Sequence, residues 1–317
     1  MSDATARPRT GVAGRLTRAA GPTSLSFELF PAATAAGDTR LRATVEQLAS
    51  LRPDFFSVTY GAAGAATGAS RSLTAWLARG TVPVVAHVTF AGMTAAQVRE
   101  VAADLLADGV RDFLALRGDL PPGVTPPDGR RGDGRPADGE LGRASDLVAL
   151  LRDLAAATGC EVGVGVAAAP AALDHLPTDV PPTRCGDLQA LLGKQAAGAD
   201  YAITQVVFDP ASYARYVRVA RRAGVTLPLV PGIVPLTDPG RLRRLQQISG
   251  VDVPPHVLDL LDAETDAQRR AAAGTALGAE LARALLDAGA PGLHVFTFDQ
   301  YEPTAALLHA AGLRPAP

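Results

Sequence analysis

The chain has few of the residues that cross-link a protein or anchor it in a membrane. Its 317 residues include only two cysteines, Cys160 and Cys185, whose spacing fits neither a metal site nor a disulfide framework. No run of about 18 apolar residues occurs, so no membrane span is predicted. The first 23 residues are basic and small but lack the apolar core of a signal peptide. We therefore expect a cytoplasmic protein.

A strong excess of either charge is also missing. The formal net charge is −2, which gives no electrostatic case for binding nucleic acid. Hydrophobic residues make up 47% of the chain, enough to bury a sizeable core.

What the sequence does have is a regular alternation of two patterns. Short β-branched or aromatic runs alternate with longer segments of helical period, several of which open on Ser, Thr or Asp and close on Gly. The predicted strands cover residues 24–30, 54–60, 82–89, 112–117, 161–168, 201–208, 227–233 and 292–298.

Eight strand-helix units favour a single-domain (β/α)8 TIM barrel of the α/β class, with an open doubly wound sheet as the alternative. Three helical segments, 238–248, 254–263 and 266–288, stand between the last two strands where one would suffice. We assign residues 1–23 to a disordered tail and 24–313 to the barrel domain.

Several motif-like stretches do not support the function that they suggest. The glycines of GVGVAA (163–168) lie inside a strand, whereas a dinucleotide fingerprint is a turn that opens into a helix. The glycine-rich loop 60–70 lacks the Lys and Ser/Thr of a Walker motif. Arg-Gly-Asp occurs at 117–119 and 131–133, but a role in cell adhesion would need an export signal.

Polar residues within or just after the predicted strands are the most informative feature. In a closed parallel barrel, the carboxyl ends of all strands meet at one mouth, so residues far apart in sequence become neighbours. Burying one such group without a partner would cost a few kcal/mol. A structural hydrogen bond explains any single one equally well, but the set together favours a functional site. Its members are Glu28, Thr59, Tyr60, His87, Arg117, Asp119, Gln205 and Thr297.

Two positions in this set suggest specific chemistry. Glu28 lies between Phe27 and Leu29, where burial is expected to raise its pKa and make it a general acid. Arg117 and Asp119 flank Gly118, so both charges could face the mouth and bind a polar, ring-shaped ligand.

Several blocks together resemble one known family. They are SFELFPAAT (26–34), DFFSVTYGAAG (54–64), VVAHVT (84–89), LALRGDLPPG (114–123), GADYAITQVVF (198–208), LVPGIVPLT (229–237) and GLHVFTF (292–298). In this order they are similar to the methylenetetrahydrofolate reductases, and the resemblance covers the chain from Ser24 to Leu313.

The resemblance implies a flavoprotein of one-carbon metabolism and methionine biosynthesis. FAD would bind at the barrel mouth, NADH or NADPH would reduce it and leave, and 5,10-methylenetetrahydrofolate would then take the same site and become 5-methyltetrahydrofolate. A homo-oligomer is also implied.

Residue roles follow from the same resemblance. Glu28 and Asp119 would be catalytic, Glu28 as the acid and Asp119 as the carboxylate beside the flavin and pterin. The implied substrate contacts are Asp119, Gln205, Thr59, Arg241 and Gln300. The implied cofactor contacts are Thr59, Tyr60, Ala62, His87, Arg117, Gly118, Asp119, Ala144, Ala169, Asp187 and Lys194.

The chain departs from the family pattern at four positions. Ala169 and Arg143 stand where aromatic residues are usual, Leu245 where bacterial relatives often have Phe, and Gln300 where some have Arg. These departures keep two alternatives open: a flavin-independent reductase that uses NADH directly, and a non-catalytic folate-binding barrel.

Overall fold

The computed structural model describes residues 11–16, 23–60, 67–118, 140–176 and 181–314. Eight parallel strands form a closed barrel in sequence order, with β1 pairing with both β2 and β8. The strands are β1 (Ser24–Leu29), β2 (Phe55–Val58), β3 (Val84–Thr89), β4 (Asp112–Leu116), β5 (Gly163–Ala168), β6 (Tyr201–Val206), β7 (Leu229–Ile233) and β8 (Gly292–Phe296). The predicted TIM barrel is therefore confirmed.

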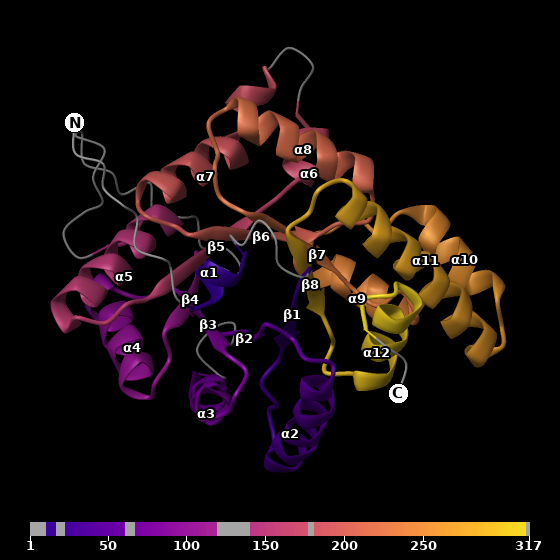
Figure 1. The fold of residues 1–317 in the computed structure, drawn as a ribbon, viewed down its shortest axis with the longest axis horizontal. Helices are drawn as coiled ribbons and strands as arrows, with labels where there is room; N and C mark the ends of the chain where they lie inside the picture. The colour runs from indigo at the N-terminus through magenta and orange to yellow at the C-terminus, as the bar shows by residue number, and fades with distance from the viewer. Residues whose placement is uncertain (1–10, 17–22, 61–66, 119–139, 177–180, 315–317) are drawn as a thin grey trace.

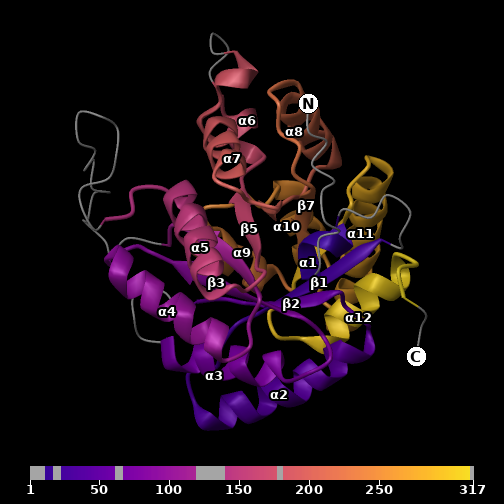
Figure 2. The same ribbon diagram turned by 60° about the vertical axis from the view of Figure 1, so that its left-hand side comes forward.

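Helices surround the barrel and cover one of its ends, as Figures 1 and 2 show from two directions. They are α1 (Gly11–Leu16), α2 (Ala35–Ser50), α3 (Thr67–Ala78), α4 (Ala95–Ala107), α5 (Ala144–Thr158), α6 (Ala171–Asp174), the 3₁₀ helix η2 (Pro182–Arg184), α7 (Gly186–Ala196), α8 (Pro210–Arg222), α9 (Pro239–Ser249), α10 (Pro255–Ala263), α11 (Ala267–Asp287) and α12 (Tyr301–Ala310). The three segments predicted between the last two strands form α9, α10 and α11.

Alternation along each strand divides the side chains between two environments. Leu25, Phe27 and Leu29 of β1 belong to the large core cluster beneath the helices, whereas Ser26 and Glu28 alternate with them and face the barrel interior. Polar groups at the alternate positions of β1 are thus directed into the barrel.

Two glycines make room inside the barrel for large rings. A Cβ on Gly165 of β5 would lie 2.5 Å from the ring of Tyr201, and one on Gly232 of β7 would lie 2.6 Å from the ring of Phe296. Gly165 therefore serves packing inside β5, in keeping with the expectation that GVGVAA is part of a strand and not a dinucleotide fingerprint.

Helix α1 closes the amino-terminal end of the barrel. Val12, Ala13 and Leu16 are buried against inward-facing side chains of the strands, including Tyr201. The Val12 N–H donates a hydrogen bond to Asp112 at the start of β4 (3.3 Å). Residues 11–16 are thus packed, although they fall in the segment predicted to be a disordered tail. The other residues of that segment, apart from residue 23, lie outside the described part, so the domain division stays a prediction.

Candidate functional site

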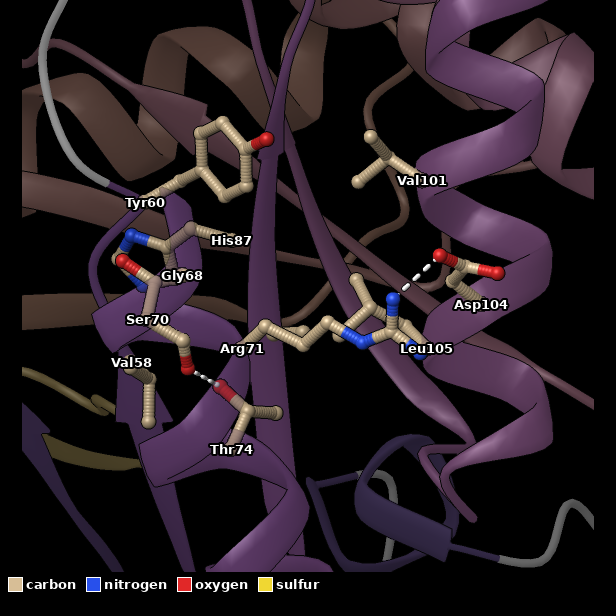
Figure 3. A pocket seen from close by; sticks show the side chains of 11 residues that line it. Val58, Tyr60, Gly68, Ser70, Arg71, Thr74, His87, Val101, Asp104 and Leu105 are labelled. Atoms are coloured by element: carbon tan, nitrogen blue, oxygen red, sulfur yellow. Dashed lines mark hydrogen bonds and ion pairs between the residues drawn. The ribbon is translucent and has the colours of Figure 1, made fainter. Parts of the chain in front are cut away.

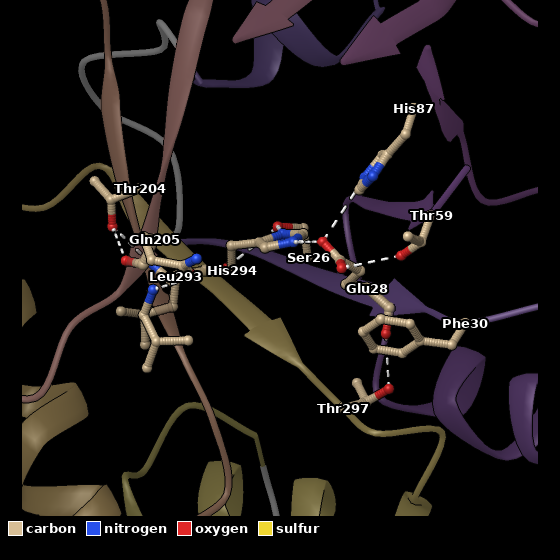
Figure 4. Close-up of polar contacts among 12 residues, drawn as sticks. Ser26, Glu28, Phe30, Thr59, His87, Thr204, Gln205, Leu293, His294 and Thr297 are labelled. Carbon is tan, nitrogen blue, oxygen red and sulfur yellow. Dashed lines mark hydrogen bonds and ion pairs between the residues drawn. The ribbon is translucent and has the colours of Figure 1, made fainter. Parts of the chain in front are cut away.

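Glu28 lies at the carboxyl end of β1, inside the mouth of the barrel, and is only 6% exposed. Its Oε1 accepts a hydrogen bond from the Thr59 hydroxyl (3.0 Å), at the end of the neighbouring strand β2. Its backbone carbonyl accepts one from the Thr297 hydroxyl (2.8 Å), just after β8. Glu28 is therefore held from both sides of β1, at its carboxyl by Thr59 and at its backbone by Thr297 (Figure 4).

His294 of β8 faces the second oxygen of this carboxyl. Its Nε2 lies 3.4 Å from Glu28 Oε2, and its Nδ1 lies 2.8 Å from the Ser26 hydroxyl. Phe55 stacks on the imidazole at 6.2 Å and Phe296 meets it edge-on at 5.1 Å, which fixes the plane of the ring. When Ser26 donates to Nδ1, Nε2 carries the proton and donates it to Glu28.

His87 of β3 approaches the same oxygen from the other side. Its Nε2 lies 3.7 Å from Glu28 Oε2, and within the described part of the chain this nitrogen has no hydrogen-bond partner. Burial, the largest influence, lowers the pKa of His87 despite the nearby carboxylate, so the imidazole is neutral at neutral pH.

The expectation that Glu28 has a raised pKa is wrong for this structure. Burial alone would raise it, but His87, His294 and the Thr59 hydroxyl act in the opposite direction and hold the pKa of Glu28 below its usual value. Because His87 is itself neutral, the hydrogen bonds from His294 and Thr59 account for this direction best. The sequence predicted the burial of Glu28 but not the hydrogen-bond donors around it.

Gln205 lies at an irregularity in β6. The pairing of β6 with β7 shifts between Ile203 and Val206, as in a β-bulge. The Thr204 hydroxyl accepts from the Gly232 N–H (3.0 Å) and donates to the Gln205 carbonyl (2.6 Å). The half-buried Gln205 side chain accepts from the Val206 N–H (2.9 Å), and Figure 4 shows it on the same side of the barrel as His294.

The end of β4 carries the Arg117–Gly118 pair. Arg117 is exposed, and its carbonyl accepts hydrogen bonds from the backbone N–H groups of Phe90 (3.2 Å) and Ala91 (2.9 Å). Gly118 has a φ of +83°, and a Cβ there would lie 2.9 Å from the Thr89 Cβ, so the turn requires glycine. Asp119 and Ala62, both predicted site residues, lie outside the described part of the chain.

A cavity of about 320 Å³ opens between α3 and α4, beside the mouth (Figure 3). Tyr60 and His87, both predicted cofactor contacts, line it together with Ser70, Arg71 and Thr74. Ser70 donates to the Thr59 carbonyl (3.0 Å), which ties α3 to the end of β2. The cavity therefore adjoins the Glu28 cluster through His87.

Two predicted cofactor contacts on α7 already have protein partners. The Tyr216 hydroxyl of α8 donates a hydrogen bond to Asp187. Lys194 donates to the Ala167 carbonyl at the end of β5 (2.7 Å), and burial lowers the pKa of Lys194. Asp187 thus ties α7 to α8, and Lys194 ties α7 to β5.

The remaining predicted contacts lie at or near the mouth. Ala144 begins α5 and the half-buried Ala169 follows β5. Arg241 lies in the first turn of α9, 3.4 Å from Asp238, and the half-buried Gln300 immediately precedes α12. Leu245, by contrast, is buried in an apolar cluster that α9 shares with α10.

The sequence reasoning missed three residues of this site: Ser26, His294 and Asp299. Ser26 and His294 occupy inward positions of apolar strands, so strand alternation applied to β1 and β8 together would have found them. Asp299 was overlooked because it lies after β8, which ends at Phe296. Only the turn that follows β8 brings the Asp299 side chain back against the end of β1.

The fold and this cluster define an α/β-barrel protein with its site at the carboxyl ends of the strands, where barrel enzymes keep their catalytic groups. A buried carboxyl between two imidazoles is suited to proton transfer. Within the described residues, no group of three or more metal-ligating side chains is placed to hold a metal ion. No helix in that part of the chain is long and apolar enough to cross a membrane.

Comparisons with known proteins agree with this class. The methylenetetrahydrofolate reductase family model matches residues 15–312. The 5,10-methylenetetrahydrofolate reductase of Escherichia coli is 31% identical over 99% of both chains. A probable methylenetetrahydrofolate reductase (NADH) of Oryza sativa is 29% identical over 92% of this chain and 49% of its own. A Clostridium thermocellum protein described as binding two copies of 5-methyl-5,6,7,8-tetrahydrofolic acid shares the fold, with a TM-score of 0.58, 13% identity and coverage of 92% and 94%.

The chain belongs to the methylenetetrahydrofolate reductase family.

Proposed function

We propose that this protein reduces 5,10-methylenetetrahydrofolate to 5-methyltetrahydrofolate, with NADH or NADPH as electron donor and FAD as cofactor. The observation that carries the proposal is the buried Glu28 carboxyl, within 3.7 Å of His87 and 3.4 Å of His294 in a chain of this family.

The reaction needs one proton at a defined place. A proton on N10 of the folate breaks the bond between N10 and the bridging methylene carbon, which leaves an iminium at N5. A hydride added to that carbon gives the methyl group. FAD, when bound, supplies this hydride after taking it from the nicotinamide.

Glu28 is the group that delivers the proton. In the free protein its low pKa makes it a carboxylate, so it must first take up a proton. A folate that covers the mouth excludes water and favours the protonated carboxyl. The Nε2–H of His294, oriented by Ser26, hydrogen-bonds Glu28 Oε2 and fixes the direction of the carboxyl, which takes up its proton from solvent before the folate closes the mouth.

The described residues fit a flavin at this mouth. His87 presents a buried nitrogen without a partner, Tyr60 and His87 line the adjoining cavity, and Arg117 is exposed at the rim for an anionic group. We further propose that Gly118 allows close approach of the ligand to the backbone, and that Ala62, Asp119, Ala144 and Ala169 complete the cofactor site.

For the folate, we propose five polar contacts around the mouth. Gln205 on β6 and Thr59 after β2 would hydrogen-bond the pterin, and Asp119 would lie beside it. Arg241 on α9 and Gln300 at the start of α12 would bind the rest of the substrate. Holding the substrate rings in contact distance supplies most of the remaining catalysis.

A flavin-independent reductase is a second candidate. Asp187 and Lys194 are held by Tyr216 and the Ala167 carbonyl, and Ala169 has no aromatic ring for a flavin to pack against. On this alternative NADH would transfer hydride to the folate directly, and Glu28 would keep its role.

The test uses the freshly purified protein. We expect a yellow flavin spectrum, loss of that spectrum on anaerobic addition of NADH or NADPH, and its return with methylenetetrahydrofolate as 5-methyltetrahydrofolate forms. Product formation by colourless protein would favour the flavin-independent alternative. Folate binding without oxidation of either nicotinamide would contradict both and indicate a non-catalytic barrel.

We also propose that residues 24–313 form the catalytic domain and that the protein assembles as a homo-oligomer. The size of the particle in solution tests the second point.

A further inference from the structure

The turn between β8 and α12 has an unusual backbone. Phe298 and Asp299 both adopt the left-handed region, with φ of +51° and +54°, although neither is glycine. Residues other than glycine are rarely found there, and such strain persists only where surrounding contacts enforce it. Contacts between the turn and its neighbours must therefore hold it in this conformation.

The turn holds the last residues of β1 by three linked hydrogen bonds. Asp299 Oδ1 accepts from the Phe30 N–H (3.0 Å), and the Asp299 N–H donates to the Thr297 hydroxyl (3.1 Å). That hydroxyl donates to the Glu28 carbonyl (2.8 Å). Glu28 is thus clamped on its own carbonyl and, two residues later, at Phe30.

We propose that Asp299 is a positioning residue for Glu28, which holds the end of β1 so that the Glu28 carboxyl stays directed at His294. The inference rests on the proposed function, because only a proton-transferring Glu28 needs this accuracy. It assigns a role to a residue that does not itself touch the reacting atoms.

The charge of Asp299 adds a second effect. Glu28 on β1 and Arg241 on α9 are the charged groups that act on it. Burial and, to a smaller extent, the Glu28 carboxylate together raise the pKa of Asp299 to about 6, although the Phe30 N–H and Arg241 act in the opposite direction. Since repulsion between two carboxylates is mutual, ionised Asp299 favours protonation of Glu28.

Two substitutions distinguish the effect of the hydrogen bond between Asp299 and Phe30 from the effect of the Asp299 charge. Asp299→Asn keeps an oxygen acceptor for Phe30 and tolerates the left-handed backbone, but it removes the charge. Asp299→Gly also suits the backbone and removes both acceptor and charge. Glu100→Gln, at an exposed position on α4, is a matched control for loss of a carboxylate.

The primary measurements need neither cofactor nor turnover. In Asp299→Gly we expect the Phe30 amide to exchange with solvent about tenfold faster or more, and in Asp299→Asn and Glu100→Gln to keep its protection. The ¹³C resonance of the Asp299 carboxyl, assigned by its loss in Asp299→Asn, should titrate at least ~0.5 pH unit lower in Glu28→Gln, which removes the neighbouring charge.

Measurements of turnover then test whether the position of Glu28 matters for catalysis. Asp299→Gly should lose about tenfold or more in kcat, with Asp299→Asn intermediate. Unchanged Phe30 exchange in Asp299→Gly, or full turnover despite faster exchange, would overturn the proposal. If the wild-type protein forms no 5-methyltetrahydrofolate while the amide and carboxyl signals still change as expected, the proposed function fails and the clamp stands.

Discussion

At the scale of single residues, the site depends on one imidazole held in one orientation. His294 is fully buried, and its two nitrogens face Ser26 and Glu28. A rotated ring or the other tautomer would turn the proton away from Glu28. Because an ionised Glu28 can only accept, it favours the tautomer with the proton on Nε2, and Ser26 then donates to Nδ1.

Replacing Ser26 with alanine should destabilise the protein by about 1–3 kcal/mol, because His294 Nδ1 would be buried without a partner. Ser57 provides the control. It is also fully buried and pairs with Glu28 in the sheet, but its hydroxyl has no partner among the described residues. We expect Ser57→Ala to shift the midpoint of urea unfolding much less than Ser26→Ala. Equal shifts would show that the Ser26–His294 hydrogen bond contributes nothing.

At the scale of elements, α1 and β4 meet around a buried carboxyl. Burial raises the pKa of Asp112 to about 6 from an ordinary value of 3.8. A raised pKa means that the folded state disfavours the carboxylate. The associated cost is absent below about pH 4, grows as the pH rises through about 6, and is constant above it.

The Asp112→Asn protein should lack this part of the pH dependence while keeping an acceptor for the Val12 N–H. Relative to the wild type, it should gain up to about 3 kcal/mol in unfolding free energy between pH 4 and pH 7.5. Urea unfolding at both pH values measures the gain. Asp299 also has a raised pKa but is present in both proteins, so its contribution cancels. If the difference in unfolding free energy between the two proteins were the same at both pH values, the raised pKa of Asp112 would be contradicted.

The elements themselves were largely predictable from the sequence. Strand alternation and helix caps predicted all eight strands, and the structure shortens each run by one to three residues. The shortening has a clear cause at β5, where the predicted strand began at residue 161 but pairing with β4 starts at Gly163. A strand extends only as far as its backbone pairs with a neighbouring strand, whereas the hydrophobic pattern in the sequence continues beyond that point into the loop.

At the scale of the whole molecule, barrel closure creates the site. Glu28 and His294 lie 266 positions apart in the chain but occupy paired strands, because β8 returns to β1. The sequence predicted a polar mouth with Glu28, Thr59, His87 and Gln205. It could not predict which imidazole would donate to Glu28, since that depends on inward positions of two distant strands. The lowered pKa of Glu28 follows from the same contacts.

Closure of the barrel also gives its two ends different roles. Helix α1 and Asp112 occupy the amino-terminal end, where they affect the stability of the barrel, whereas the Glu28 cluster occupies the carboxyl end. Changes at Asp112 should therefore leave catalysis unaltered.

The most direct test of the central claim is a comparison of the two half-reactions in Glu28→Gln and wild-type protein by anaerobic stopped-flow absorbance. Glutamine keeps the size of the side chain but cannot deliver a proton. We predict that reduction of the flavin by NADH stays within about twofold of wild type, while reoxidation by methylenetetrahydrofolate falls by at least ~100-fold, as expected for loss of a general acid. Equal loss in both half-reactions, or an unchanged folate step, would contradict the role of Glu28.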